Sequence, residues 1–110
     1  FRMRSEARLA AGVRPEDVIL DPGFGVAKAT EQNYELLAGL GELCALGYPV
    51  LAGLSRKSMI YKVLGVTPAE SLAGTVALGW ECLRQGAKIL RVHDVREAAD
   101  TVRLFNMFRR

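Results

Sequence analysis

Three short, almost uninterrupted apolar runs do most to limit the folds open to this 110-residue chain. They cover residues 18–20, 50–53 and 89–92, and stretches with helical periodicity separate them. Runs of this kind are typical of strands buried on both faces of a parallel sheet, whose connections need helical crossovers. The sequence therefore predicts an α/β protein of about three β/α units.

The helices are predicted from caps and apolar spacing. Residues 1–11 read as the end of a helix closed by Gly12, and Thr30 is the expected N-cap of a helix that reaches Gly47. A short helix is expected to start at Ser55 and to end at Gly65. These positions match ordinary helix start and stop signals.

Two further helices complete the predicted pattern. Thr67-Pro68-Ala69-Glu70 combines an N-cap, a first-turn proline and a capping-box glutamate, and Asp94 is the expected cap of the last helix. The apolar stripes expected to be buried are Leu72, Val76, Trp80 and Leu83 on the first helix, and Val95, Ala98, Val102 and Phe105 on the second.

Composition excludes several classes of protein. Half of the residues are hydrophobic and 25% are charged, as in globular domains, and the net charge of +3 comes from scattered residues, so we expect no nucleic-acid partner. Glycines and Pro49 interrupt the apolar stretch 36–55, so we expect no membrane span. Cys44 and Cys82 are isolated, as in a cytoplasmic protein with reduced, buried thiols.

Polar residues follow each predicted strand. Asp21-Pro22-Gly23-Phe24-Gly25 follows the first, Ser55-Arg56-Lys57-Ser58 the second, and Arg91-Val92-His93-Asp94 ends the third. Because parallel strands end on one face, these groups should share one rim, where ligands bind in such folds.

The chemistry of this rim points to an anionic ligand. Arg91 interrupts a run expected to be buried, and a buried guanidinium needs an anionic partner. His93 is two residues away and therefore on the same side, and with Lys57 the two residues would form a phosphate pocket. A helix start at 55–58 would add backbone N–H donors. The carboxylate of Asp21 would bind an amino-pyrimidine edge.

Each of these groups also has a purely structural alternative. Asp21 can organise a turn before Pro22-Gly23. Arg56 and Lys57 can form a solvated pair, and His93 with Asp94 can be a strand exit and a helix cap. The residues alone leave both possibilities open.

Four motifs in this order resemble the dihydropteroate synthase family: residues 21–25 followed by Lys28 and Asn33, then 55–60, Gly74-Thr75, and 91–95. The resemblance implies that residues 1–110 are the C-terminal segment of a pterin-binding TIM-barrel domain whose N-terminal part is absent. It implies condensation of a pterin pyrophosphate with p-aminobenzoate in folate biosynthesis, a sulfonamide target and a homo-oligomer. We therefore expect the 110-residue chain alone to be inactive.

The resemblance also implies residue roles. Asp21 would hold the pterin and Lys57 would contact both substrates. Arg91 and His93 would bind the pyrophosphate, which leaves with assistance from Mg2+, and Val92 is a further expected substrate-binding residue. The protein ligand of the Mg2+ would lie outside this segment. The p-aminobenzoate side would involve Gly25, Val26 and Ser58. Val26-Ala27 stands where the family usually has Phe-Gly, so we expect weaker packing on the aminobenzoate ring.

Two alternatives remain at this point. A pterin-binding methyltransferase of the methyltetrahydrofolate type would share the barrel and Asp21 but needs no pyrophosphate pocket. A non-catalytic piece would cover its exposed strand edges with another copy of itself.

Overall fold

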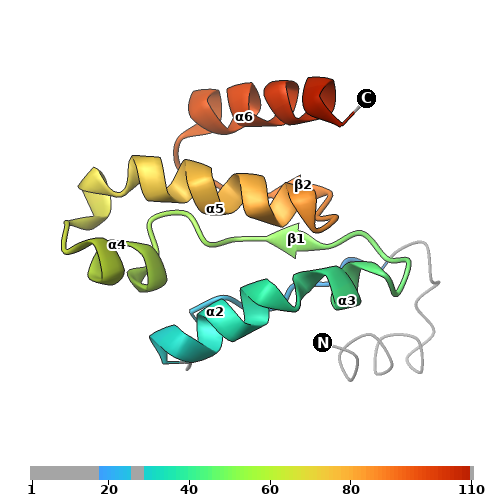
Figure 1. The fold of residues 1–110 in the computed structure, drawn as a ribbon, viewed down its shortest axis with the longest axis horizontal. Helices are drawn as coiled ribbons and strands as arrows, with labels where there is room; N and C mark the ends of the chain where they lie inside the picture. The colour runs from blue at the N-terminus through green and yellow to red at the C-terminus, as the bar shows by residue number, and fades with distance from the viewer. Residues whose placement is uncertain (1–17, 26–28, 110) are drawn as a thin grey trace.

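A computed structural model describes residues 18–25 and 29–109, so the predicted helix over 1–11 lies outside the described residues. The elements are α2 (Thr30–Ala38), α3 (Leu40–Cys44), β1 (Leu51–Ala52), α4 (Ser58–Leu64), the 3-10 helix η2 (Pro68–Glu70), α5 (Leu72–Arg84), β2 (Ile89–Leu90) and α6 (Val95–Phe108) (Figure 1). Among these residues, no helix is long and apolar enough to span a membrane.

The strands pair in parallel, as predicted. Leu51 faces Ile89 and Ala52 faces Leu90 in the β1–β2 ladder, and Leu20 forms a single parallel bridge with Val50. Among the described residues, the first apolar run forms only this one bridge. The backbone turns soon afterwards at Gly23, whose φ is 74°. The α/β class is confirmed, with a shorter first strand than expected.

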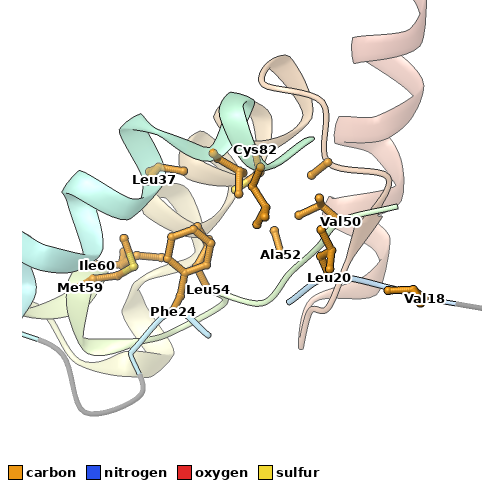
Figure 2. Close-up of a cluster of buried hydrophobic side chains, with 13 residues drawn as sticks. Val18, Leu20, Phe24, Leu37, Val50, Ala52, Leu54, Met59, Ile60 and Cys82 are labelled. Carbon is orange, nitrogen blue, oxygen red and sulfur yellow. The ribbon is translucent and has the colours of Figure 1, made fainter. Parts of the chain in front are cut away.

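The core lies on the helical side of this sheet. Phe24, Leu54, Met59 and Ile60 form one end of the core in Figure 2, and Leu20 and Val50 lie toward the other. Side chains alternate along β1, as a strand requires. Ala52 and Leu54 are buried, whereas Leu51 and Gly53 face the opposite side and line a cavity.

The predicted single helix with Thr30 as its N-cap is wrong in two places. The N-cap is Ala29, and the helix breaks at Gly39, where α2 ends and α3 begins. Gln85, at the end of α5, supplies partners for the interrupted backbone. Its Nε2 donates to the Leu37 carbonyl at 2.6 Å, and its Oε1 accepts the Gly41 N–H at 2.7 Å. A break whose backbone groups are satisfied in this way costs little.

The capping box at Thr67 is confirmed, since both its backbone N–H and its hydroxyl donate to Glu70 at 3.0 Å. It starts η2, and α5 then begins after Ser71. The face of α5 toward the sheet carries small side chains, and its buried residues are Thr75, Gly79 and Cys82.

The predicted apolar stripe of α5 faces α6 instead. Trp80 packs edge-on against Phe105, with ring centroids 5.1 Å apart, and against Phe108 at 5.7 Å. On α6, Phe105 is buried as predicted, whereas Val95 is 70% exposed, so the predicted stripe is wrong at its first position.

The two cysteines are free thiols, as expected. Cys82 is buried and Cys44 is half-buried. Burial raises the pKa of the Cys82 thiol to about 12, which keeps it protonated and unreactive.

Close packing of α4 on α5 depends on Gly74. A Cβ at this position would lie 2.5 Å from Ile60 Cγ2 and 3.0 Å from Leu64 Cδ1. We predict that Gly74→Ala lowers the free energy of unfolding, measured in urea, by about 1–3 kcal/mol.

Gly79→Ala on the same helix is the matched control. The nearest atom to a Cβ at Gly79 is Leu90 Cδ1 at 3.8 Å, an ordinary contact. Since alanine favours a helix over glycine by about 1 kcal/mol, this variant should be as stable as the wild type or more stable. Equal stability of the two variants would contradict the packing argument.

Candidate active site

The ends of the three strand segments line a cavity of about 290 Å³. It brings together five of the residues predicted for the site: Asp21, Lys57, Arg91, Val92 and His93. The remaining lining residues are Gly23, Leu51, Gly53 and Ser55. The predicted convergence at one rim is therefore confirmed for these residues.

The other predicted residues lie beside the cavity or outside the described chain. Gly25 packs against Lys57, since a Cβ at Gly25 would lie 3.2 Å from Lys57 Cδ. Ser58 is half-buried at the first residue of α4. Val26 lies outside the described residues.

Asp21 organises a turn and also lines the cavity. Its Oδ1 accepts the Gly23 N–H at 2.8 Å, which organises the turn after the first strand. The same half-buried carboxylate lines the cavity. The turn bond thus fixes the orientation of a carboxylate that a ligand can reach.

Lys57 links the second strand end to the loop after Asp21. Its Nζ donates to the Phe24 carbonyl at 2.5 Å. Its methylene chain passes over Gly25, whose φ of 81° also favours glycine at that position. The contact places the positive charge of Lys57 beside the Phe24 carbonyl, and Lys57 also lines the cavity.

Asn33 supports this loop, a role the sequence did not reveal beyond its place in a motif. The side chain is 1% exposed. Its Oδ1 accepts the Gly25 N–H at 2.7 Å, and its Nδ2 donates to the Ala29 carbonyl at 3.1 Å. One feature of the sequence could have indicated that Asn33 is buried. It lies four residues before Leu37, so the two side chains share the buried side of α2.

Arg91 is exposed, so its predicted burial is wrong. It follows the last residue of β2, and within the described chain β2 pairs only with β1, which leaves its other edge open. The stem of Arg91 lies over Gly53, where a Cβ would be 3.6 Å from Arg91 Cβ. The missing side chain at Gly53 therefore gives Arg91 room to reach across β1.

His93 is also exposed and is held by Ser55 from the neighbouring strand end. The Ser55 Oγ lies 3.0 Å from His93 Nδ1 and accepts the His93 backbone N–H at 3.2 Å. Ser55 itself is buried and does not cap α4, which begins at Ser58. The predicted N-cap at Ser55 is therefore wrong.

Arg56 and Lys57 diverge and do not form a solvated pair. Arg56 binds Asp94 through two hydrogen bonds, from Nη2 at 2.7 Å and from Nε at 3.2 Å. Its backbone N–H donates to Thr75 Oγ1 at 3.2 Å. These bonds hold Arg56 at a φ of 56°, which is unusual for a residue other than glycine, and so orient the next residue, Lys57.

Asp94 occupies the N-cap position of α6, but its side chain makes no cap hydrogen bond. Its carboxylate binds Arg56 instead, and those hydrogen bonds hold the pKa of the Asp94 carboxyl below its ordinary value. Asp94 is thus already paired, and among the described residues Asp21 is the carboxylate that lines the cavity together with the basic groups.

The arrangement is suited to a ligand with a hydrogen-bonding heterocycle at one end and an anion at the other. Lys57, Arg91 and His93 can bind the anion, and Asp21 can accept hydrogen bonds from the heterocycle. In the described part of the chain, no three His, Cys, Asp or Glu residues are close enough together to hold a metal ion. These residues do not fit a protein-built metal site.

The Arg56–Asp94 pair gives a testable pH dependence. A lowered folded-state pKa means that the pair stabilises the fold above the ordinary Asp pKa of about 3.9, and that this stabilisation is lost as the pH falls through the lowered value. We predict that Asp94→Asn is less stable than the wild type in urea at about pH 7, and that the difference shrinks toward about pH 2.

Glu97→Gln, at an exposed carboxyl in the first turn of the same helix, is the control and should show little difference at either pH. A gap between wild type and Asp94→Asn that stays constant down to about pH 2 would contradict the ion-pair account.

Known proteins are similar to this chain in sequence and in fold. The model of the pterin binding enzyme family matches residues 1–93. Dihydropteroate synthase of Haemophilus influenzae is 46% identical over 105 residues, which cover 96% of this chain and 38% of that protein. The chain thus spans well under half of the length of this relative.

Solved structures of dihydropteroate synthases are also similar to this chain. The crystal structure of Yersinia pestis dihydropteroate synthase matches with a TM-score of 0.94 and 41% identity, over 99% of this chain and 51% of that one. The Coxiella burnetii enzyme in complex with pteroic acid matches with a TM-score of 0.92 and 36% identity, over 98% and 40% of the two chains. The fold is that of part of a TIM barrel, and the chain belongs to the pterin binding enzyme family.

Proposed function

We propose that this chain provides the pterin-pyrophosphate side of a dihydropteroate synthase. The reaction joins 6-hydroxymethyl-7,8-dihydropterin pyrophosphate to p-aminobenzoate and gives 7,8-dihydropteroate and pyrophosphate. The observation that carries the proposal is a single cavity lined by Asp21 together with Lys57, Arg91 and His93. The identity to the Haemophilus influenzae synthase supports it.

Asp21 is the proposed pterin ligand. Its carboxylate can accept two parallel hydrogen bonds from the amino-pyrimidine edge of the pterin. The Gly23 N–H takes up one lone pair of Oδ1 at 2.8 Å and limits the rotation of the carboxylate. A fixed acceptor loses little entropy when the flat heterocycle binds.

Arg91 and His93 are the proposed pyrophosphate ligands, and Lys57 lies between the two substrates. As the C–O bond to the pterin methylene breaks, its electron pair leaves with the pyrophosphate. The amine of p-aminobenzoate then forms the new C–N bond and releases a proton. The protein contributes positive charge at the leaving group and the alignment of the substrates, without a protein nucleophile.

The p-aminobenzoate side involves Gly25, Val26 and Ser58 in this proposal. Ser58 directly follows Lys57, so a ring bound beside Lys57 lies within reach of the start of α4. The proposal extends to inhibition by sulfonamides, which mimic p-aminobenzoate. Val26 offers less flat surface for either ring than the phenylalanine usual in the family.

Mg2+, a homo-oligomeric state and a cytoplasmic location stay predictions, and no step of the proposed reaction depends on them. The proposal also keeps the expectation that this chain alone does not turn over. A methyltransferase of the methyltetrahydrofolate type has no use for a pyrophosphate pocket, so the three basic residues disfavour it.

Anion binding tests the pyrophosphate side. Hydrogen bonds to charged groups contribute about 1.5–3 kcal/mol, so we predict that Arg91→Gln weakens pyrophosphate binding by about tenfold to a hundredfold in isothermal titration calorimetry. Arg96→Gln removes the same charge from an exposed position on α6 and should bind as the wild type does.

Asp21→Asn separates the two halves of the site. It should weaken binding of 6-hydroxymethylpterin and leave pyrophosphate affinity within about twofold of the wild type. Equal pyrophosphate affinities for Arg91→Gln and Arg96→Gln would refute the assignment of the anion site.

A further inference from the structure

Ser55 is buried, and its hydroxyl contacts one residue, His93, within residues 18–25 and 29–109. It is 5% exposed at the end of the second strand run. Its Oγ lies 3.2 Å from the backbone nitrogen of His93 and 3.0 Å from Nδ1 of the His93 ring. Both contacts join positions 38 residues apart in the sequence.

The chemistry of these two contacts fixes where the protons lie. A backbone N–H can only donate, so Ser55 Oγ is the acceptor in the first contact. In the described part of the chain, the hydroxyl proton of Ser55 then has one acceptor, which is Nδ1. A nitrogen that accepts this proton carries none itself.

We infer that Ser55 holds neutral His93 in the tautomer that is protonated on Nε2. In the opposite tautomer, Nδ1–H would donate to Oγ, which would then accept two protons. The hydroxyl proton of Ser55 would be left in a buried position without an acceptor among the described residues, and such an arrangement is unfavourable.

This inference rests on the proposed function for its role in the reaction. His93 lines the cavity with Arg91 and Lys57, and because Ser55 engages Nδ1, Nε2–H is the ring group left for a ligand. Neutral His93 then presents a donor, not an acceptor, to the pyrophosphate oxygens. The neighbouring Asp94 carboxylate accepts hydrogen bonds from Arg56 at both of its oxygens, so it is already engaged and does not compete for the Nε2–H of His93.

Ser55 is therefore a positioning residue for the anion site, acting through His93. The sequence pattern predicted a helix-capping role for Ser55, but the N-cap of α4 is Lys57. The same contacts fix the ring orientation, because the backbone and the ring of His93 are bound by one oxygen atom.

Nitrogen-15 NMR of the His93 ring tests this directly, since the chain contains one His. Long-range correlations from the ring C–H protons distinguish the two nitrogens. Spectra recorded on the high-pH plateau, where the ring shifts no longer change with pH, report the neutral ring. In the absence of any ligand, we expect Nδ1 at the shift of an unprotonated nitrogen and Nε2 at that of a protonated one. A protonated Nδ1, or an averaged mixture of the two tautomers, would overturn the inference.

Two variants assign the effect to Ser55. Ser55→Ala should shift both ring nitrogens toward an averaged mixture, and Ser55→Thr should keep the wild-type pattern. Ser71→Ala removes another buried hydroxyl, which donates to the Pro68 carbonyl and not to His93, and should leave the ring unchanged. A wild-type pattern in Ser55→Ala would show that Ser55 does not set the tautomer.

The result is independent of the proposed function, because no ligand is present. If the tautomer is as inferred and added pyrophosphate leaves the Nε2 resonance unmoved, the pyrophosphate assignment fails while the role of Ser55 stands.

Discussion

The parallel register of the three strand segments is the constraint on which the candidate site depends. Leu51 N–H donates to the Leu20 carbonyl at 2.8 Å, and Arg91 N–H donates to the Ala52 carbonyl at 2.9 Å. Because the strands run in one direction, these bonds align their ends. A slip of one residue would turn the alternate side chains toward the helices and empty the rim of its charged groups.

Along residues 51–54, alternate side chains point into the apolar core and toward the cavity. Ala52 and Leu54 are buried in the core, and Gly53, between them, faces the cavity and makes room for the stem of Arg91. Several positively charged side chains close together repel one another. Two of them already have a partner here, which limits this repulsion: Arg56 is paired with Asp94, and Lys57 donates to the Phe24 carbonyl. With Arg56 and Lys57 engaged in this way, Arg91 and His93 are the basic side chains placed to bind an incoming anion.

The sequence predicted the features that local chemistry determines. The apolar runs, the capping box at Thr67 and the meeting of Asp21, Lys57, Arg91 and His93 at one rim follow from strand direction and short-range spacing. Features set by partners distant in the sequence were missed. The helix break at Gly39 depends on Gln85, and the contacts of Ser55 with His93 and of Arg56 with Asp94 each span 38 residues.

The central claim is that one cavity holds the heterocycle at Asp21 and the pyrophosphate at Arg91 and His93. A crystal structure of the protein with 6-hydroxymethyl-7,8-dihydropterin pyrophosphate tests it most directly. The account predicts the amino-pyrimidine edge within hydrogen-bond distance of the Asp21 carboxylate and phosphate oxygens within that distance of Arg91 and of His93 Nε2. A pyrophosphate bound elsewhere, or a pterin that makes no contact with Asp21, would contradict it.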